Sequence, residues 1–351
     1  MSQFPTNSID GNRGTRVLLL LLLLVPVFFL LDLMVGSYYI PIPEIVKAIF
    51  RPEITDSQIA LIINQFRIPK ALTAILAGAA LSVAGLQMQT VFRNPLAGPY
   101  ILGVSSGASL GVALLVLGTG GMLGGSIGSA IGSWGIVAAA WIGSGLILLL
   151  IALISNRIKD IMTILILGIL ISSAISAVVN ILQYFSNESM LKSFVVWTMG
   201  SLGSVTNNQL SVLLPSVLLG MAMAIFSSKF LDAFLLGENY AKSMGMNIRF
   251  ARKMVFLSTC ILAGSITAFC GPIGFIGIAV PHIARMVLGT SRHLLLVPGT
   301  ILIGALMMLL SDVISQLPGS EHTLPVNSVT ALMGIPIVIW IIVRNQKMGQ
   351  L

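Results

Sequence analysis

Ten apolar segments, most of them long enough to cross a lipid bilayer, constrain this chain more than any other feature. We expect membrane-spanning helices at residues 17–36, 60–92, 98–117, 133–155, 161–184, 209–228, 253–270, 274–288, 294–316 and 325–343. A single crossing needs about 20 apolar residues. Because only 9% of the 351 residues are charged and 56% are hydrophobic, nearly the whole chain must lie within lipid. The sequence therefore predicts an all-α integral membrane protein, with about ten transmembrane helices in a single domain over residues 1–351.

The first segment resembles a secretory signal peptide, because Arg13 and Arg16 precede it. Its apolar core is longer than the usual core of about 7 to 15 residues, and no clear small-x-small cleavage site follows. We therefore expect a membrane helix that is kept on the protein, preceded by a cytoplasmic tail at residues 1–16.

Basic residues give the expected orientation. With the N-terminus in the cytoplasm, the outer side receives only a few of the 19 lysines and arginines, namely Lys47, Arg51, Arg67, Lys70 and Lys192. The positive-inside rule favours this arrangement, which places both termini of a multi-pass plasma-membrane protein in the cytoplasm. The basic residues are spread along the chain, so the net charge of +8 does not indicate nucleic-acid binding.

Three connections have structure of their own in the expected topology. Residues 187–208 are too short and too polar to span, and we expect a partial helix there at the outer surface. The glycine-rich residues 118–132 are expected to form an outer loop. The cytoplasmic residues 229–253 contain two stretches that each end at a glycine, Gly237 and Gly245, which predicts two short helices. Such a pair either lies on lipid or docks a soluble partner.

Two motifs rich in proline and glycine interrupt the apolar segments. The first is RNPLAGP at residues 93–99, and the second begins with GPIGFIG at residues 271–277 and continues to Arg285. Proline and glycine break helices, and a bilayer tolerates broken backbone only where protein or a water-filled cavity satisfies the freed polar groups. This combination indicates a transporter.

Polar side chains follow one face of the segment 161–184. Ser172, Ser176, Asn180 and Gln183 lie three or four residues apart among isoleucine, leucine and valine, and side chains at this spacing share a face of a helix. Such a stripe either holds helices together or lines a path for a polar solute. Because it runs over most of the helix, we favour a translocation pathway.

Glycine spacing predicts a close helix contact in the third segment. Gly103, Gly107 and Gly111 recur every four residues. This small-xxx-small pattern lets another helix approach closely, so we interpret the three glycines as packing residues.

Charged residues also fall near the outer ends of the expected spans. Asp32 and Asp312 are intramembrane carboxylates, which are candidates for function, for example as proton relays. Both lie toward the outer half of their helices, where water and headgroups lower their cost, so we favour a structural role. Arg67 and Lys70 flank Pro69. They either reach lipid headgroups or present a cationic patch to an acidic partner, and their spacing does not decide between these alternatives.

The sequence carries no recognisable catalytic or nucleotide-binding motif. It has no G-x-x-x-x-G-K-[ST] and not even a Gly-Lys pair, so we do not expect nucleotide binding through a P-loop. H-E-x-x-H is also missing, and Cys260 and Cys270 are too far apart on one expected helix to bridge each other. We therefore expect no enzyme activity and no bound metal or cofactor. Active transport would take its energy from an ion gradient or from a separate ATPase.

Several motifs together resemble a known family. They are RIPK at residues 67–70, LAGAALSVAG at 76–85, RNPLAGP at 93–99 followed by ILGVSSG at 101–107, LGE at 236–238, the block 271–285, and LPV at 324–326 with TALMGIP at 330–336. Over about residues 60–343 the chain is similar to the FecCD family, the permease subunits of bacterial ABC importers for iron-siderophores, haem and vitamin B12.

The resemblance implies several partners. A second permease subunit, usually an identical copy, would complete a central pathway within the membrane lipid. Two cytoplasmic ATPase subunits would bind ATP and Mg, and an extracytoplasmic binding protein would deliver the chelate. The polar stripe on segment 161–184 falls where the family lines its pathway. The ATPase-coupling surface would lie in residues 229–253 and comprise Leu236, Gly237, Glu238, Ala241 and Gly245.

The resemblance also suggests a role for the outer basic residues. Arg67 and Lys70 match the family's R-x-P-R, whose basic side chains receive acidic residues of the binding protein. Lysine at the second position keeps the charge but loses the bidentate fork of arginine. A further basic residue of some members is replaced here by Gln316, so that contact is not expected.

The sequence is therefore interpreted as the permease of an ATP-driven importer that takes up a metal chelate by alternating access. An iron(III)-siderophore is the first choice of substrate, with haem and vitamin B12 as alternatives. The rival class is an ion-gradient-driven secondary transporter, which would need Asp32 or Asp312 as the coupling carboxylate. The helix breaks and the polar stripe disfavour a membrane scaffold that transports nothing.

Overall fold

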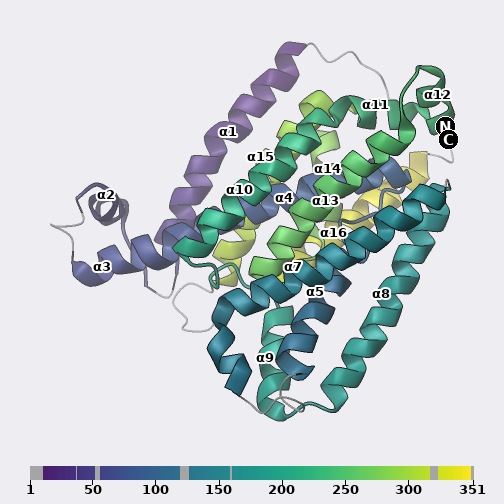
Figure 1. Ribbon diagram of the computed structural model, residues 1–351. Coiled ribbons are helices and arrows are strands. Elements are labelled where there is room, and N and C mark those ends of the chain that lie inside the picture. Colours follow the sequence, from purple (N-terminus) through teal and green to yellow (C-terminus); the bar gives the residue numbers. More distant parts are fainter. Residues whose placement is uncertain are drawn as a thin grey trace.

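The computed structural model describes residues 11–36, 38–51, 56–118, 126–158, 160–316 and 323–348, and within these ranges it is helical without strands. Each expected span corresponds to a helix or a run of helices (Figure 1). They are α1 (Gly11–Met34), α3, η1 and α4 (Ser57–Leu61, Ile62–Arg67, Ile68–Phe92), α5 and η2 (Val104–Ala113, Leu114–Gly118), α7 (Ser126–Arg157), α8 (Ile161–Tyr184), α10 (Asn207–Phe226), α13 (Ile248–Cys270), α14 (Ile276–Leu288), α15 (His293–Ser315) and α16 (Val326–Met348).

Length and composition support a membrane location for these helices. Within the described residues, 7 helical stretches are long and apolar enough to cross a membrane, and three shorter apolar helices, Val104–Gly118, Ile276–Leu288 and Val326–Trp340, accompany them. A shorter helix is tolerated where neighbours cover its ends. The prediction of an all-α membrane protein is confirmed.

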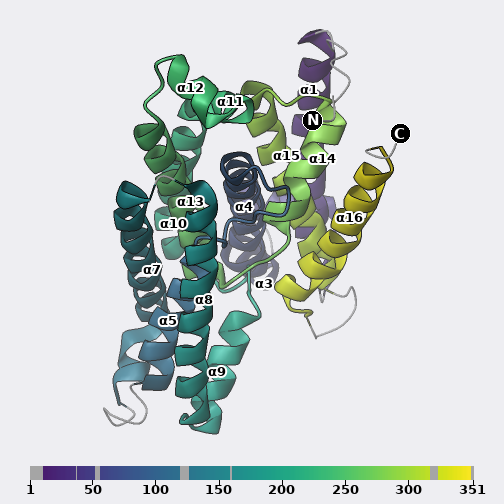
Figure 2. The same cartoon turned by 90° about the vertical axis from the view of Figure 1, so that its right-hand side faces the viewer.

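The helices run between two ends of the bundle (Figure 2). One end, here called the α12 end, carries α11 (Ser228–Leu236) and α12 (Glu238–Ser243), together with the start of α1 and the last turns of α16. The opposite end, the α9 end, carries α9 (Glu188–Thr198) and the short helices α2 (Ile42–Phe50) and α3. The expected pair of glycine-stopped helices and the expected partial helix in residues 187–208 are thus both present.

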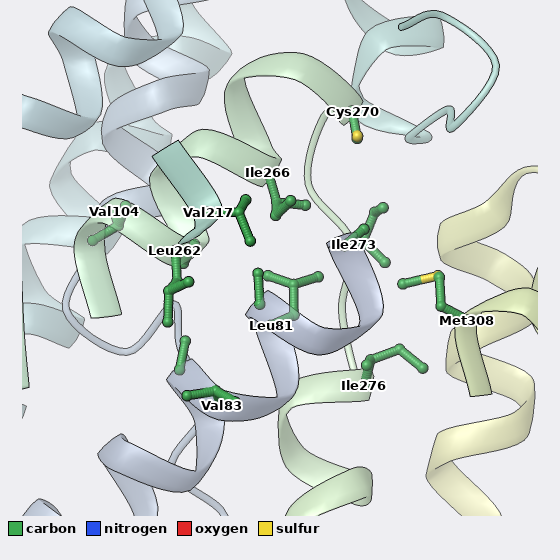
Figure 3. Close-up of a cluster of buried hydrophobic side chains, with 14 of the residues drawn as sticks. Leu81, Val83, Val104, Val217, Leu262, Ile266, Cys270, Ile273, Ile276 and Met308 are labelled. Atoms are coloured by element: carbon green, nitrogen blue, oxygen red, sulfur yellow. The ribbon is translucent and has the colours of Figure 1, made fainter. Parts of the chain in front are cut away.

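Helix α4 lies at the centre of the bundle, surrounded by α10, α13, α14 and α15 (Figure 2). In the span that contains α4, Ser57–Phe92, 83% of the most apolar 18-residue window is buried, and the same share is 78% in α13. In α1 and in α8 the share is only 17%. Leu81 of α4 packs in an apolar cluster with Ile266 of α13, Ile276 of α14 and Met308 of α15 (Figure 3). Helices as exposed as α1 and α8 must face lipid or another subunit.

Glycines set the closest helix contacts. A Cβ on Gly78 of α4 would lie 2.1 Å from the carbonyl oxygen of Gly304 of α15, so these backbones touch. The same holds for α5 and α7, where a Cβ on Gly107 would lie 2.6 Å from the carbonyl oxygen of Gly143. The predicted packing role is confirmed for Gly107 and also for Gly111, where a Cβ would lie 2.0 Å from the carbonyl oxygen of Ala139 on α7. Gly103 instead precedes α5 with a φ of 77°, a left-handed conformation that favours glycine.

Proline and capping residues explain where several elements begin. Pro69 occupies the first turn of α4, where its missing N–H costs no helix hydrogen bond, and the π-helical turn η1 joins α4 to α3. The Asn247 side chain accepts from the backbone N–H of Phe250, so α13 begins at Ile248, earlier than the expected 253.

The structure corrects two further sequence-based boundaries and adds one helix that was not predicted. The loop predicted for residues 118–132 is wrong from Ser126 onward, where α7 is already helical, and residues 119–125 lie outside the described residues. Glycine is tolerated in membrane helices because lipid leaves backbone groups no partner outside the helix. The tail expected at residues 1–16 is helical from Gly11. Helix α2 was not predicted, although Pro43 lies in its first turn.

Candidate functional site

The pair α11 and α12 lies across one end of the bundle (Figure 2). Gly237 separates the two helices with a φ of 114°, which favours glycine. Helix α11 contacts α4 and α15, and its Leu231 and Phe234 are buried. Leu236, the last residue of α11, is 64% exposed. The pair is therefore anchored on one side and presents an apolar side chain on the other.

The residues predicted to form the ATPase-coupling surface have different surroundings. Leu236 and Gly245 are exposed, and a Cβ on Gly245 would meet nothing within 4 Å. Glu238 is half-buried, and its Oε1 lies 2.6 Å from Nη2 of Arg252 on α13. Ala241 is fully buried. Surface contacts are therefore available at Leu236, Glu238 and Gly245, whereas Ala241 packs inward.

Helix α4 reaches the pair through Arg93. This residue ends α4 with a φ of 47°, a left-handed conformation that is uncommon outside glycine. Its Nε and Nη2 both donate to the carbonyl oxygen of Phe234, at 3.2 and 2.8 Å. The arginine that opens the 93–99 motif therefore ties the end of α4 to α11.

Side chains of α14 satisfy the first helix break, at residues 93–99. His282 Nε2 lies 2.8 Å from the carbonyl oxygen of Pro95. Arg285 Nη1 donates to Gln89 Oε1 at 2.8 Å, and Gln89 donates in turn to a backbone carbonyl of α14 at 3.0 Å. Broken backbone inside a membrane needs such partners, so the break is part of a defined structure.

The second break, at residues 271–274, is held in the same way. The backbone N–H of Ile273 donates to Tyr100 Oη at 3.3 Å, and that of Gly274 donates to Asn327 Oδ1 at 2.8 Å. Tyr100 follows the first break, so the two breaks contact each other. The RNPLAGP and GPIGFIG motifs, far apart in sequence, therefore form one feature of the fold.

A polar cluster joins three helices toward the α9 end. Lys70 Nζ of α4 lies 3.0 Å from Asp312 Oδ1 of α15. Gln316 Nε2 donates to Asp312 Oδ2 and to Asp32 Oδ1 of α1, each at 3.0 Å. Both carboxylates are buried, at 0% and 3% exposure. We call Asp32, Arg67, Lys70, Asp312 and Gln316 the α9-end cluster.

Arg67 completes the cluster by binding the end of α1. Its Nη1 donates to the carbonyl oxygens of Leu33 at 2.5 Å and Met34 at 3.1 Å, and its Nη2 donates to that of Tyr38. Carbonyls at the C-terminus of a helix lack partners within the helix and attract a positive charge. Arg67 therefore caps α1.

The contacts of this cluster bear on the sequence-based roles. Arg67 and Lys70, predicted to bind an acidic partner, both bind groups of this chain, and Lys70 is 21% exposed. Asp32 and Asp312 make the contacts expected of structural residues. Gln316, which links both carboxylates, was not predicted as a structural residue. It follows Asp312 by one helical turn, but Asp32 lies on α1 and no sequence spacing relates it to Gln316.

A cavity of about 520 Å³ lies beside the polar face of α8. Its lining consists of Tyr100, Ile101, Ser106, Ile169, Ser172, Ser173, Ser176, Ala177 and Asn180. The hydroxyls of Ser172 and Ser176 donate to backbone carbonyls one turn earlier on α8, at 2.8 and 2.9 Å. Their oxygens remain able to accept hydrogen bonds from a solute.

The predicted pathway residues are only partly brought together. Ser172, Ser176 and Asn180 line the cavity, and Gln183 does not border it. Tyr100 and Ser106 line it and were not predicted. Their position within and beside the ILGVSSG motif could have indicated them, because that segment follows a helix break.

The surface of α8 is largely uncovered by the rest of the chain. Ile166, Leu170 and Ile181 are 55%, 58% and 58% exposed. Apolar side chains beside a polar cavity on the same helix suit a surface shared between lipid and a second subunit.

Apolar spanning helices, helix breaks held by neighbouring helices and a hydroxyl- and amide-lined cavity define a membrane permease. The model of the FecCD transport family matches residues 21–344. The chain belongs to this family and is the permease of an ABC importer.

Relatives match over nearly the whole chain. The chain is 34% identical over 336 residues to the vitamin B12 import system permease protein BtuC of Salmonella paratyphi A and equally to that of Salmonella typhimurium, covering 95% of this chain and 97% of each relative. It is also similar to a solved structure of a protein assigned to the metal-chelate type of ABC transporter, in an inward-facing conformation. That match has a TM-score of 0.83 and 30% identity, and covers 94% of this chain and 99% of the other.

Proposed function

We propose that this permease takes up a bulky metal chelate, with an iron(III)-siderophore as the first candidate. In this proposal the α12 end faces the cytoplasm, with both termini, and the α9 end faces outward. The single observation that carries the proposal is the chain-long similarity to permeases of chelate importers. The distribution of basic residues supports the orientation.

The pair α11 and α12 is the proposed docking surface for a cytoplasmic ATPase. The exposed Leu236 and the half-buried Glu238 would contact the ATPase, and Gly237 and Ala241 would hold the backbone in place. Support comes from the tethers of this pair to the spanning helices, through Arg93 and Arg252. A docking element must be attached to the helices that it moves.

The cavity beside α8 is the proposed start of the pathway wall, completed by a second copy of the permease. Its lining of hydroxyl, amide and phenol groups carries no formal charge, which suits a large polar chelate that must be released as well as bound. Gln183 extends the same face of α8 beyond the cavity. Exposed apolar side chains on α8 support a partner copy there.

Three substrates are candidates for this permease. Vitamin B12 is the specific alternative, because the relatives named above are vitamin B12 permeases. An iron-siderophore and haem stay open, because the separate binding protein is expected to set most of the selectivity. Arg67 and Lys70 remain the proposed contact with that protein, and this contact would compete with the α9-end cluster for Lys70.

Uptake by vesicles tests the proposal. The permease is co-purified with the ATPase and binding protein encoded beside it, and reconstituted with ATP available to the ATPase. The probes are a ferric siderophore labelled with radio-iron, cyanocobalamin labelled with radio-cobalt, and haemin. ATP-dependent uptake of the ferric siderophore supports the proposal, and uptake of cyanocobalamin or haemin alone overturns the substrate. Accumulation on a proton or sodium gradient by the permease alone would overturn the ATP-driven mechanism.

A further inference from the structure

A buried histidine joins α11 to two spanning helices. His293 is the first residue of α15 and is 1% exposed. Its Nδ1 and its backbone nitrogen lie 2.7 and 2.9 Å from the same atom, Oδ1 of Asp232 on α11. Its Nε2 lies 3.0 Å from Oγ1 of Thr90, a buried residue near the end of α4. One imidazole, carried by α15, therefore contacts side chains of two other helices, α11 and α4.

Asp232 acts as a cap supplied by another helix. The residue before α15, Arg292, makes no side-chain cap, so the first backbone N–H of α15 finds its acceptor on α11. A carboxylate at a helix N-terminus is also favoured by the helix dipole. Partial burial raises the pKa of Asp232, but the hydrogen bonds from His293 outweigh this effect and bring the pKa below 3.8. The carboxylate is thus ionised at neutral pH and fixed to the start of α15.

Thr90 and His293 each take part in two side-chain hydrogen bonds along this chain of contacts. Thr90 Oγ1 also lies 2.9 Å from the carbonyl oxygen of Leu86, to which its single hydroxyl proton is directed. Its oxygen lies 3.0 Å from His293 Nε2, while the Nδ1–H of His293 donates to the Asp232 carboxylate, which can only accept. Both ring nitrogens therefore have hydrogen-bond partners, one on α4 and one on α11.

The two helices that His293 joins form one packed unit. Gly78 and Gly304 bring the backbones of α4 and α15 into contact at mid-length. Lys70 and Asp312 connect the same two helices toward the α9 end. A displacement of α11 would therefore be carried to both helices along their length.

We propose that the hydrogen-bonded chain of Asp232, His293 and Thr90 attaches α11 to α15 and α4, and passes the movement of the docking pair to these helices during transport. The three are positioning residues, since they act through the helices that they join. The inference rests on the proposed ATPase docking at α11 and α12. It adds to the attachment by Arg93, which reaches only α4.

The decisive measurement is the amount of chelate taken up per ATP hydrolysed. The complete importer, with its ATPase and binding protein, is reconstituted in vesicles, and uptake and hydrolysis are measured in the same preparation. Asp232→Ala is expected to lower uptake per ATP by about five-fold or more, while the ATPase stays bound and hydrolyses ATP.

A matched variant separates transmission from loss of a helix cap. Asp160 caps α8, and its hydrogen bonds run to the backbone of Met162 and to Thr163 in the first turn of that helix. Asp160→Ala thus removes a carboxylate cap from a spanning helix without touching α11. Uptake per ATP should stay near the wild-type value in this variant. An equal loss in Asp160→Ala and Asp232→Ala would overturn the inference.

Conservative variants test the two sides of the imidazole. His293→Asn places an amide donor near the Nδ1 position, toward Asp232, and His293→Gln places one near the Nε2 position, toward Thr90. We expect His293→Asn to retain more of the coupling, because it keeps the link to α11. Thr90→Ser should retain coupling that Thr90→Val loses. These variants also serve if Asp232→Ala does not fold.

The outcomes distinguish the inference from the function on which it rests. If the wild-type importer shows no ATP-dependent uptake of any chelate, the proposed function fails, and the inference fails with it. If the wild type transports and every variant keeps the wild-type uptake per ATP, the inference alone fails. Coupling lost in Asp232→Ala and Thr90→Val, and retained in Asp160→Ala and Thr90→Ser, supports it.

Discussion

Replacing Lys70 by methionine tests whether this residue holds the bundle together or only contacts a partner. Methionine keeps much of the aliphatic stem but removes the charge. Asp312 is 0% exposed and would lose its ion pair, retaining the Gln316 amide as a donor. Breaking a buried pair costs about 3–5 kcal/mol, against about 0–1 kcal/mol at a surface. Lys70 is 21% exposed and Gln316 remains as a donor. We therefore expect Lys70→Met to lower the free energy of unfolding by about 3 kcal/mol, the lower end of the buried range.

Thermal unfolding of the purified permease in detergent measures this cost. A loss of about 3 kcal/mol should lower the unfolding temperature by about 4 °C in a chain of this size. Lys70→Arg keeps the charge and should stay close to the wild type. Lys192→Met, at an exposed position on α9, is the control for a lost positive charge and should shift stability by less than about 0.5 kcal/mol. Adding Asp312→Leu to Lys70→Met should restore much of the loss.

Two results would refute this reasoning. The first is an unfolding temperature for Lys70→Met equal to that of Lys192→Met, which would mean that Asp312 does not depend on Lys70. The second is a double variant with Asp312→Leu that is no more stable than Lys70→Met. If stability is unchanged but the binding protein docks more weakly, Lys70 serves docking alone.

Three further predictions concern packing, pH and the pathway. Gly304→Ala would place a Cβ 2.4 Å from the Gly78 carbonyl oxygen and should lower the free energy of unfolding by about 1–3 kcal/mol. The control Gly145→Ala, where a Cβ would meet nothing within 4 Å, should raise it by about 0.5–1 kcal/mol. Equal unfolding temperatures for the two variants would contradict the contact. The pKa of Asp232 is lowered, so the stability that its carboxylate contributes is present at neutral pH and is lost as the pH falls through that pKa. The difference in unfolding free energy between wild type and Asp232→Asn should therefore shrink in acid. A difference that does not change with pH would contradict this. Ser176→Trp should narrow the cavity and reduce uptake while the ATPase stays bound, and unchanged uptake would exclude this cavity from the pathway.

The helical architecture could be predicted from the sequence because lipid offers the backbone no hydrogen-bond partners. A run of apolar residues in a bilayer must be helical, since its polar groups have no other partners, and the positions of the spans follow directly. Gly237 and Gly245 allowed the ends of two short helices to be predicted, because glycine is the residue that most readily adopts a positive φ after a helix. Both have a positive φ in the structure. Local chemistry of this kind can be read from single residues.

Contacts between segments that are distant in sequence could not be predicted in this way. Lys70 and Asp312 meet across the bundle, as do Asp232 and His293, and no periodicity relates either pair. The motif resemblance directed attention to Lys70 as a surface residue, whereas the packing of α4 on α15 turns it toward Asp312. Buried polar groups find partners through tertiary structure, and only the fold shows which ones.

The arrangement of polar contacts suggests which helices move together during transport. Gln87 of α4 donates to Ser258 of α13 at 3.0 Å and accepts from Thr259 at 2.9 Å, and all three are buried. With the contacts of α15, these bonds make α4, α13 and α15 one connected block, and the docking pair is attached to it at every tether described above. Helix α8 lines the proposed pathway, and only 17% of its apolar window is buried. Transport is therefore expected to change the position of α8 relative to this block, because separating the block itself would break buried hydrogen bonds that have no other partner.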